Sequence, residues 1–512
     1  MRLLDRTQPA SLSVTPLSLQ CDPDALLEGL CREDQPVLLD SAARGDWGRY
    51  TILTCQPMEV LTLADGELRT TGGAVLSADR EALWTALREA MATVQTDSPG
   101  PGEGPPYGPG WFGYLGYEVG RCVERLPGRA RRDTPLPDLR LAFHDAALVH
   151  DAADGHWWLT ELHFADPLDG AGRTAEALRR ITSAPPCTSN ELARGTRPAD
   201  PESHTHAGGV APSACSKAAR PTATFSLRAE SNFTPDAYRR AVQRCVDYIA
   251  AGDIFQVNLS QRFTLARPAS PATIYRCLRR RNPAAYAAYL AFAADGQNCA
   301  VLSSSPELFL RVRGRRVITR PIKGTRPRGA HAATDRSAAA ELLASGKDNA
   351  ELAMIIDLLR NDLGRVCRFG TVGVGEARRL ETHPTVHHLV GTVEGELRDG
   401  VSPAELLRAT FPGGSITGAP KIRAMEIIDE LEGVARGVYT GCIGWIGITG
   451  DAEWNIAIRT IVCCGDRALV QAGGGVVADS TPDGEYRETL AKARALLDAL
   501  AMAQQADAGE PD

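Results

Sequence analysis

Lys323 is the residue whose surroundings most favour chemistry in this chain. It lies in a short run that also contains Arg320, Arg326 and Arg328. Crowding by like charge favours the neutral, nucleophilic form of a lysine amine. The sequence therefore predicts a reactive lysine at this position. The alternative is a basic loop in water, in which Lys323 is one more solvated cation.

A carboxyl group is predicted to lie beside this amine. Residues 307–313 and 316–322 alternate as two strands do, with a turn at Gly314 and Arg315 between them. This turn places Glu307 opposite Ile322, one position from Lys323. Opposed residues of an antiparallel pair lie about 5 Å apart. The carboxyl and the amine would then flank one small space.

Two further pairs of acids could hold a metal ion. Asp348 and Glu351 stand at the start of one helical pattern, and Glu485 and Glu488 at the start of another; in each pair a spacing of three residues puts both acids on one face. A hard divalent cation bound through oxygen ligands would relieve the repulsion within each pair, and Mg²⁺ fits that description. The alternative is two solvated helix faces. The counter-ions on those faces would be Lys347, Arg487 and Lys492.

Two glycine-rich segments could offer backbone N–H groups to an anion. Residues 412–421 form a turn that feeds a helix beginning near Pro420, but Ala419 follows the last glycine, where a phosphate-binding P-loop needs lysine. The amides of that helix could hold a carboxylate instead, or the segment is a tight turn without a ligand. Residues 473–475 are three successive glycines at the end of a strand pattern, where absent side chains expose N–H groups.

The elements that position these residues indicate an α+β fold with large antiparallel sheets packed against helices. Strand and turn signals fill residues 1–184 and predict a meandering antiparallel sheet. Its clearest strands are residues 49–63, 140–150 and 157–162.

The second half of the chain predicts both helices and strands. A helix can begin at Thr234 or Pro235 and continue through apolar residues at helical spacing. A second meander follows nearer the C-terminus. Its strands are residues 438–448, 453–464 and 469–477.

A change of composition divides the chain. Residues 185–223 are rich in Pro, Ser, Thr, Ala, Gly and His and almost lack large apolar side chains, which predicts a disordered linker. We expect an N-terminal region over 1–184, a catalytic domain over 224–503 and a tail over 504–512.

Composition excludes several classes of protein. The chain has 512 residues, of which 43% are hydrophobic, and a net charge of −7, which argues against a nucleic-acid-binding protein. The 13 cysteines are scattered without paired ligand spacing and indicate reduced thiols. We find no segment of signal-peptide or membrane-spanning type. The sequence therefore predicts a cytoplasmic protein that binds neither nucleic acid nor membrane.

Taken together, several motifs resemble the chorismate-utilising enzymes over most of residues 225–500. They are Ser-Pro-Glu at 305–307, Pro-Ile-Lys-Gly-Thr-Arg-Pro-Arg-Gly at 321–329, Ala-Glu at 350–351, Asp-Leu-Leu-Arg-Asn-Asp-Leu-Gly-Arg-Val at 357–366, Val-His-His-Leu-Val at 386–390 and Gly-Ala-Pro-Lys at 418–421. Weaker support comes from Gly-Tyr-Leu-Gly-Tyr-Glu at 113–118. The resemblance implies a β-sandwich core flanked by helices.

The resemblance also implies roles for individual residues. Glu307 would be the general acid that protonates a departing hydroxyl, and His388 would lie near that leaving group or orient it. Glu351 and Glu488 would hold Mg²⁺ on the ring carboxylate of chorismate, with Asp348 and Glu485 as closer or water-mediated helpers. The carboxylates of chorismate would be bound by Arg459, Tyr439, Ser415 and the amides of Gly473 and Gly475. Gly324 and Thr325, which follow Lys323 in its motif, would also bind the substrate.

Two positions distinguish members of this family. The isochorismate and salicylate synthases use a lysine to activate water where this chain has Gln256, an amide that cannot take a proton. Anthranilate synthases carry alanine at the position of Lys323, whereas aminodeoxychorismate synthases have the pattern Pro-Ile-Lys-Gly-Thr. Lys323 therefore favours aminodeoxychorismate synthesis. The alternatives are anthranilate synthesis and a non-catalytic protein that binds chorismate.

A lysine nucleophile would decide where the nitrogen ends. If ammonia attacked C2 of chorismate, the product would lead to anthranilate. If Lys323 attacks C2 first, ammonia can displace it at C4 and leave 4-amino-4-deoxychorismate.

Ammonia would come from a separate glutamine amidotransferase subunit. A glutaminase nucleophile elbow has the pattern Gly-x-Cys-x-Gly. The closest segment, at 441–444, has Thr440 in place of the first glycine and lies in an apparent buried strand. Relatives also bind tryptophan in the N-terminal region, and residues 38–41 lie where such a site would be.

Overall fold

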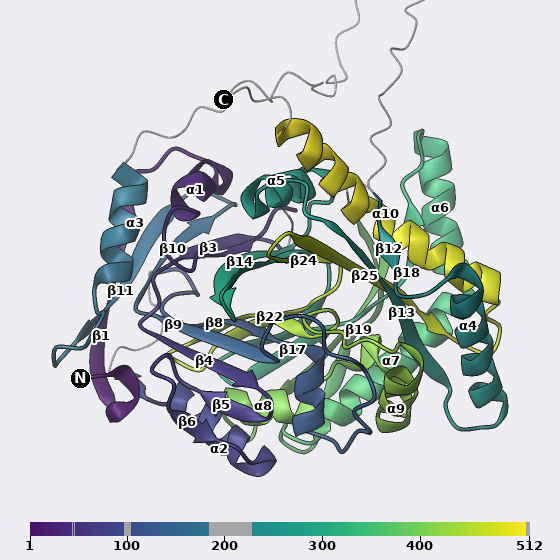
Figure 1. Ribbon diagram of the computed structural model, residues 1–512, viewed down its shortest axis with the longest axis horizontal. Coiled ribbons are helices and arrows are strands. Elements are labelled where there is room, and N and C mark those ends of the chain that lie inside the picture. The colour runs from purple at the N-terminus through teal and green to yellow at the C-terminus, as the bar shows by residue number, and fades with distance from the viewer. Residues whose placement is uncertain (44, 46, 97–103, 184–227, 384–385, 508–512) are drawn as a thin grey trace, which may run out of the picture.

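The computed structural model describes residues 1–43, 45, 47–96, 104–183, 228–383 and 386–507. The expected linker at 185–223 and residues 508–512 of the expected tail lie outside these ranges. Within the described residues, two large sheets pack face to face and helices cover their outer faces (Figure 1). This arrangement confirms the predicted α+β fold with helices packed on large sheets.

Sheet A has 13 strands among the described residues and is antiparallel except where β1 pairs with β7. Its strands, in spatial order, are β12 (Glu230–Ser231), β13 (Gln256–Ala266), β25 (Arg467–Val476), β24 (Thr460–Cys464), β15 (Gln297–Ser305), β14 (Tyr286–Ala294), β2 (Val37–Asp40), β3 (Tyr50–Thr54), β10 (Ala146–Asp151), β11 (Trp157–Phe164), β1 (Gln8–Leu17) and β7 (Val94–Thr96), with β21 (Gly418–Ala419) beside β13.

Sheet B has 12 strands within the same ranges, and its pairs are antiparallel. They are β18 (Ile322–Pro327), β20 (Val386–Glu396), β17 (Arg316–Arg320), β16 (Leu308–Arg313), β23 (Ala452–Ile456), β22 (Cys442–Gly447), β8 (Gly110–Leu115), β9 (Leu139–His144), β4 (Glu59–Ala64), β5 (Glu67–Arg69) and β6 (Val75–Ser77), with β19 (Gly373–Thr382) beside β20.

Helices form the two outer layers. One group packs its apolar face on sheet A, namely α1 (Pro23–Leu30), α3 (Arg173–Ser183), α5 (Pro271–Arg281) and α10 (Pro482–Asp507). A second group packs on sheet B, namely α2 (Arg80–Met91), α6 (Ala332–Ala344), α7 (Gly346–Gly364) and α8 (Pro403–Thr410). The helices α4 (Pro235–Ala250) and α9 (Lys421–Leu431) share a third core with β13. Three short 3₁₀ helices are η1 (Leu3–Asp5), η2 (Tyr117–Cys122) and η3 (Gly414–Ile416).

Local sequence signals set the starts of the helices near the site. Thr234 caps α4 by accepting a hydrogen bond from the Ala237 N–H at 3.2 Å, and Pro235 is its first residue. Ser345 caps α7 in the same way through the Asp348 N–H. Pro420 directly precedes α9. Polar caps satisfy N–H groups that have no partner inside a helix. A proline at the start of a helix costs no hydrogen bond, because the N–H that it lacks would have no partner within the helix.

Three strands expected from the sequence are each two strands that belong to different sheets. Residues 49–63 form β3 and β4, residues 140–150 form β9 and β10, and residues 453–464 form β23 and β24. We call each short crossing between the sheets a corner. Two of the corners contain a non-glycine residue with positive φ, Gln56 at 50° and Arg459 at 52°. The apolar pattern runs through each corner because both halves are buried in the same sandwich.

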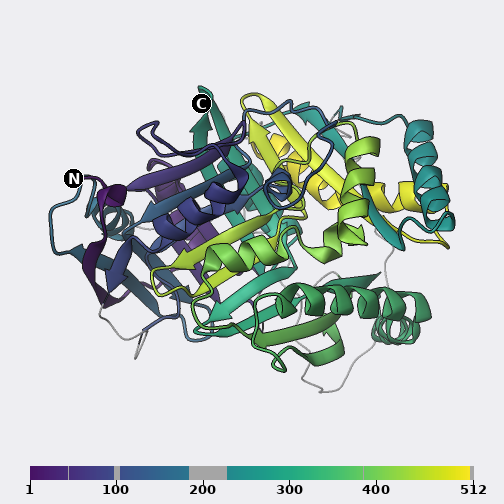
Figure 2. The same cartoon turned by 90° about the horizontal axis from the view of Figure 1, so that it is seen from below.

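The N-terminal strands do not form a sheet of their own. β2 pairs with β14, and β8 pairs with β22, so the expected N-terminal meander is divided between both sheets and continues into the second half of the chain. Figure 2 shows the early strands (purple to blue) beside the late strands (green to yellow).

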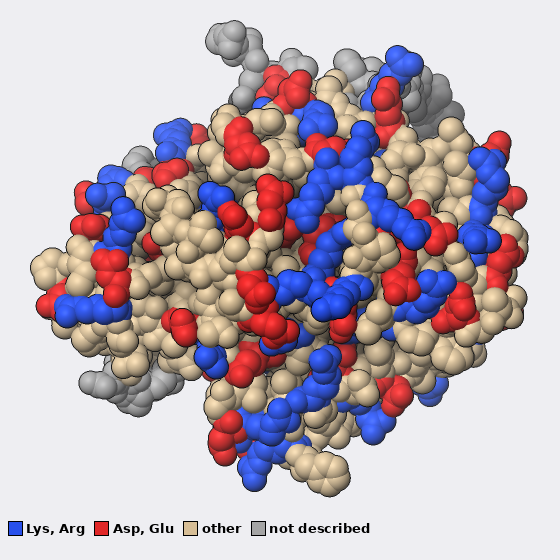
Figure 3. Space-filling model, turned by 60° about the horizontal axis from the view of Figure 1, so that its bottom comes forward, with Lys and Arg blue, Asp and Glu red and all other residues tan. Residues whose placement is uncertain are grey.

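The surface carries charge of both signs. On the face in Figure 3, basic side chains are accompanied by acidic ones across its whole width. The cysteines of the described residues are free thiols. Within the same residues, we find no helix that is long and apolar enough to cross a membrane.

Candidate active site

All fourteen residues predicted for the site line one cavity of about 650 Å³. The cavity lies where β13 and β25 of sheet A meet β18 of sheet B, between the first turns of α7 and α10. The residues are Lys323, Glu307, His388, Arg459, Tyr439, Ser415, Gly473, Gly475, Gly324, Thr325, Glu351, Glu488, Asp348 and Glu485. The tertiary structure thus brings together segments that are up to 181 positions apart (307 to 488).

Lys323 is directed into this cavity from β18. Its Nζ donates a hydrogen bond to the Ser415 carbonyl oxygen at 3.4 Å. Burial lowers the pKa of Lys323, the carboxylates of Glu351 and Glu307 act against this, and the charge of Lys492 supports it. The amine is therefore more readily neutral than an exposed lysine.

The cause of this lowered pKa differs from the predicted one. Each of the three neighbouring arginines is paired with a carboxylate, so its charge is compensated. Arg320 pairs with Glu381, Arg326 with Glu341 and Asp348, and Arg328 with Asp335. Burial, together with the like charge of Lys492, replaces the crowding by arginine that the sequence suggested.

Glu307 lies at the corner between β15 and β16. The expected hairpin of β16 and β17 is present, with a register shift that places Leu308 opposite Arg320. The backbone N–H of Ile322 donates to the Glu307 carboxylate, and Ser415 Oγ donates to Glu307 Oε1 at 2.6 Å. Burial outweighs these hydrogen bonds and the charge of Lys323 and raises the pKa of Glu307 to about 7. A carboxyl with this pKa can give and take a proton near neutral pH.

A second corner lies directly against the first. Between β23 and β24, the carbonyl oxygen of Arg459 accepts the Ser304 N–H at 3.0 Å, and the Ile456 N–H donates to the Glu307 carbonyl oxygen at 3.0 Å. Arg459 Nη1 donates to the Lys492 carbonyl oxygen at 2.6 Å, and burial lowers the pKa of this guanidinium. The two corners together place an acid and a buried guanidinium in one cavity.

His388 and Thr325 form the wall contributed by β20 and β18. Thr325 Oγ1 and His388 Nδ1 are 3.0 Å apart. Burial lowers the pKa of His388 to about 3, and the charges of His383 and Arg459 act in the same direction. The imidazole is therefore neutral at ordinary pH and can orient a group by hydrogen bonding. Tyr439, also buried in this wall, has its pKa raised by burial.

The glycines of β25 make room for neighbouring side chains. A Cβ atom at Gly475 would lie 2.3 Å from Gln256 Nε2 and 3.6 Å from Lys323 Nζ. Gly324 has φ of 75°, and a Cβ there would lie 2.9 Å from Asp348 Cγ. Both positions therefore need glycine for steric reasons.

The four acids enter the cavity from the first turns of α7 and α10. Lys347 Nζ lies 3.9 Å from Glu351 Oε1, and Lys492 Nζ lies 2.6 Å from Glu488 Oε1, so two of the expected counter-ions are present. Burial raises the pKa of Glu351. Burial also acts to raise the pKa of Glu488, but the hydrogen bond and charge of Lys492 and the charges of Lys347 and Lys323 together outweigh it, and the net shift is downward. Lysines thus balance the charge of these acids.

Some features of this donor set fit a divalent cation. Glu351 and Glu488 are close enough to influence each other electrostatically, and their carboxylate oxygens are of the type that Mg²⁺ prefers. Ser480 Oγ donates to Glu485 Oε1 at 2.6 Å, while Glu485 Oε2 is buried without a hydrogen-bond partner in the described part of the chain. Among the described residues, no group of three or more His, Cys, Asp or Glu side chains converges closely enough to hold a metal ion in this conformation.

Sequence reasoning missed two residues of the inner wall, Asn258 and Gln471. Gln256 and Asn258 alternate with apolar Val257 and Leu259 on β13, and this alternation is a signal that could have found Asn258. Gln471 precedes the glycine run by two positions in a strand that is otherwise apolar there. The N-terminus of α9, considered as an anion site, lies outside the cavity, and Lys421 Nζ pairs with Asp362 at 2.7 Å.

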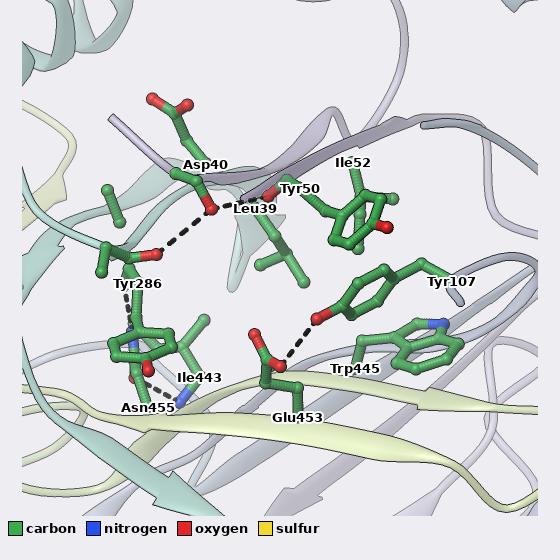
Figure 4. Close-up of a pocket in the computed structure, with 14 residues that line it drawn as sticks. Leu39, Asp40, Tyr50, Ile52, Tyr107, Tyr286, Ile443, Trp445, Glu453 and Asn455 are labelled. Carbon is green, nitrogen blue, oxygen red and sulfur yellow. Dashed lines mark hydrogen bonds between the residues drawn. The ribbon is translucent and has the colours of Figure 1, made fainter. Parts of the chain in front are cut away.

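A second, smaller pocket lies between the sheets at the segment expected to bind tryptophan (Figure 4). Leu39, Asp40 and Ser41 line it, and Tyr107 Oη donates to Glu453 at 2.7 Å on its opposite side. Its volume is about 40 Å³. At roughly 10–15 Å³ for each water molecule, this space holds a few waters, so an amino acid would enter only if these side chains moved.

The chain is similar to known enzymes over most of its length. The chain is 36% identical over 471 residues to aminodeoxychorismate synthase component 1 of Bacillus subtilis (strain 168), which covers 92% of each chain. It is 39% identical over 478 residues to anthranilate synthase component 1 of Thermus thermophilus, covering 92% of this chain and 94% of that one.

Solved structures share the fold. Anthranilate synthase component I from Streptococcus pneumoniae superimposes with a TM-score of 0.67 at 29% identity, over 88% of this chain and 93% of that one. The menaquinone-specific isochorismate synthase of Escherichia coli has a TM-score of 0.65 at 16% identity, which shows a likeness of fold alone. The family model for the chorismate binding enzyme matches residues 35–498. The chain therefore belongs to the family of chorismate binding enzymes.

Proposed function

We propose that this protein is component I of an aminodeoxychorismate synthase, which converts chorismate and ammonia to 4-amino-4-deoxychorismate for the synthesis of para-aminobenzoate and folate in the cytoplasm. The observation that carries the proposal is the buried amine of Lys323, with its lowered pKa, in the same cavity as the Glu307 carboxyl. A relative with this activity in its name is 36% identical over 92% of the chain.

Lys323 is the nucleophile of the first displacement. Its neutral amine attacks C2 of chorismate, both double bonds of the ring shift by one position, and the C4–O bond breaks. Glu307 gives its proton to the departing hydroxyl, which leaves as water. Ammonia then attacks C4, both double bonds shift back, the bond between C2 and the lysine nitrogen breaks, and Lys323 leaves as a neutral amine. The product carries the new C4 amine as its ammonium ion, and Glu307 regains a proton from solvent.

The remaining residues bind and orient chorismate. Arg459, Tyr439, Ser415 and the backbone amides of Gly473 and Gly475 hold its carboxylates, and neutral His388 orients the leaving hydroxyl with Thr325 behind it. Glu351 and Glu488 would hold Mg²⁺, with Asp348 and Glu485 nearby, and the bound cation would neutralise the ring carboxylate.

Ammonia is supplied by a separate glutamine amidotransferase subunit. Cys442, the closest candidate for a glutaminase nucleophile in this chain, is fully buried in β22, and burial raises the pKa of its thiol. Such a thiol is unavailable to glutamine.

A direct test is a search for the covalent intermediate. The full chain incubated with chorismate and Mg²⁺ but no ammonia should gain the mass of chorismate less one water, on the peptide that contains Lys323. Ammonium chloride should then release 4-amino-4-deoxychorismate, while glutamine alone should release none. Lys323→Ala should lose the adduct and at least about 100-fold in formation of this product, since covalent catalysis is lost.

The same assay separates the competing functions. Anthranilate as the product of the unmodified chain would refute the proposal in favour of an anthranilate synthase. Absence of turnover with chorismate and ammonia would indicate a non-catalytic binding protein. Circular dichroism of Lys323→Ala ensures that the loss of product does not reflect unfolding.

The metal proposal is tested by titration of Mg²⁺ in the presence of chorismate. Glu351→Gln should weaken Mg²⁺ binding by at least about tenfold, because one anionic oxygen donor is lost. Asp357→Asn, on the same helix with a side chain that is 79% exposed, is the matched control and should leave binding unchanged. Equal Mg²⁺ affinity of Glu351→Gln and wild type in calorimetry would exclude Glu351 as a ligand.

A further inference from the structure

Buried amide oxygens along and beside the inner wall of the catalytic cavity have no hydrogen-bond partner among the described residues. Gln256, Asn258 and Gln471 are 1%, 8% and 5% exposed. The side-chain carbonyl oxygen of each lacks a hydrogen-bond partner among the residues that the structure describes. A buried acceptor left unpaired costs about 1–3 kcal/mol. Asn258 and Gln471 line the cavity, and Gln256 lies next to it over Gly475. Three such acceptors close to one cavity indicate a small ligand that donates hydrogen bonds.

These three side chains form a row, which we call the amide row. Gln256 and Asn258 are two positions apart on β13 and so share one face of sheet A. Ser260 is the next residue on that face, and its Oγ accepts a hydrogen bond from Gln471 Nε2 at 2.9 Å. This bond fixes the orientation of the Gln471 amide and leaves its Oε1 free. Gln256 and Asn258 are separated by roughly 7 Å along β13. On β25, Gln471 stands opposite Arg262, and its side chain reaches back to Ser260.

The amide row ends beside the reactive lysine. The side chain of Gln256 fills the space over Gly475, where a Cβ atom would be 2.3 Å from Gln256 Nε2 and 3.6 Å from Lys323 Nζ. Asn258 and Gln471 line the catalytic cavity itself. The row therefore leads along the wall toward the atom that is proposed to attack chorismate.

The other end of the row adjoins another small cavity, of about 20 Å³, which is distinct from the pocket in Figure 4. Tyr439 and Gln471 line both this cavity and the catalytic one, so they form the partition between them. Arg262 and Thr134 line its far side. A space of this size holds one or two molecules as small as water, at roughly 10–15 Å³ each. Ammonia is of that size.

We propose that the amide row binds ammonia and guides it from this small cavity to the Lys323 end of the site. The proposal rests on the proposed function, in which ammonia is the second nucleophile. An amide oxygen accepts an N–H bond but has no proton to give, so the nitrogen lone pair stays available for attack. A carboxylate in the same place would favour the ammonium ion, which has no lone pair.

The experiment is steady-state kinetics of the full chain with ammonium chloride at fixed pH and Mg²⁺. The variants are Gln256→Met, Asn258→Leu and Gln471→Met, which keep side-chain volume but remove the acceptor. Each should raise KM for ammonia roughly fivefold, as expected for one lost hydrogen bond, while KM for chorismate stays within about twofold of wild type.

A matched control and a second variant protect the result from folding effects. Gln8→Met makes the same change at an amide that is 1% exposed, far from the cavity, where Nε2 donates to the Leu3 carbonyl oxygen at 3.1 Å. It should leave KM for ammonia unchanged. If Asn258→Leu does not fold, Asn258→Ser serves in its place, because its short side chain stays polar but cannot reach the ligand.

The outcomes separate this proposal from the proposed function. An unchanged KM for ammonia in all folded variants overturns the amide row, as does an equal rise in KM for chorismate, which would assign these amides to chorismate. Failure of the wild-type chain to use ammonium chloride also overturns it. Anthranilate as product, together with raised KM for ammonia in the variants, would refute the proposed function but support the amide row.

Discussion

Lys323 and Glu307 occupy one wall of the cavity, and burial moves their pKa values in opposite directions. It lowers the pKa of the amine and raises that of the carboxyl, so both groups are more often uncharged than they would be in water. A neutral amine is a nucleophile and a neutral carboxyl is an acid, which are the two forms that the proposed first displacement needs. Burial thus favours the neutral form of both groups.

This tuning predicts the pH dependence of the reaction. With the pKa of Glu307 at about 7, its acid form is lost as pH rises through 7, so kcat/KM should fall on the alkaline side. The hydrogen bond from Ser415 lowers that pKa. In Ser415→Ala the pKa should rise, and the alkaline limb should move to higher pH. The measurement is kcat/KM for chorismate between about pH 5.5 and 9.

Ser480→Ala is the control for this prediction. It removes the same kind of hydrogen bond from Glu485, another acid of the cavity, and should leave the alkaline limb where it is. A limb that stays unmoved in Ser415→Ala would mean that a group other than Glu307 supplies the proton.

At the scale of elements, corners rather than strands or helices carry Glu307 and Arg459. Glu307 follows β15 as the chain leaves sheet A, and Arg459 precedes β24 as the chain returns to it. Backbone hydrogen bonds join the two corners. Arg459 adopts φ of 52°, a conformation that non-glycine residues rarely take and that is often found at functional sites. The fold thus holds the Arg459 side chain in the cavity in spite of this backbone strain.

The strain at this corner can be measured with a pair of variants. Arg459→Gly and Arg459→Ala both remove the guanidinium and should both lose most chorismate binding. The glycine variant should be about 1 kcal/mol more stable than the alanine variant, because glycine accepts positive φ without steric cost. Chemical denaturation gives the difference. Equal stability of the two variants would show that the corner carries no strain that glycine relieves.

For the molecule as a whole, both sheets contain strands from the two halves of the sequence. β2 inserts beside β14, and β8 beside β22, so each half supplies a neighbour that the other half lacks. The core between the sheets contains Ile52 and Phe112 together with Leu290 and Trp445. Removal of either half would expose sheet edges and this apolar core.

This arrangement predicts the behaviour of a split protein. Residues 1–183 and residues 228–512 expressed alone should be insoluble or lack a cooperative unfolding transition. Expressed together, they should form a complex that unfolds cooperatively and retains chorismate turnover. Size-exclusion chromatography and thermal denaturation test this. A stable, monomeric 228–512 fragment would show instead that the catalytic region folds by itself.

The sequence contained much of the information about local chemistry. Cap residues such as Thr234 and Ser345 mark helix starts because they satisfy N–H groups within a few positions. The acid pairs of α7 and α10 follow from helical spacing, and the hairpin of β16 and β17 from its turn. These signals involve residues that are close in the sequence, so they can be recognised from the sequence alone. The fourteen residues expected at the site line one cavity.

The tertiary structure decided what short-range patterns cannot contain. Apolar alternation through 453–464 predicts one strand, since burial gives both halves the same pattern, yet the chain crosses between sheets at Arg459. Arg320, Arg326 and Arg328 pair with carboxylates that lie 7 to 61 positions away in the sequence, so crowding by arginine is not the cause of the lowered Lys323 pKa. Gln471 of the inner wall could not be recognised from the sequence, because its side chain contacts Ser260, which is 211 positions away. The sequence determined which groups are present. The packing of two sheets determined which residues surround each group and which charge state it favours, because burial depends on the whole fold.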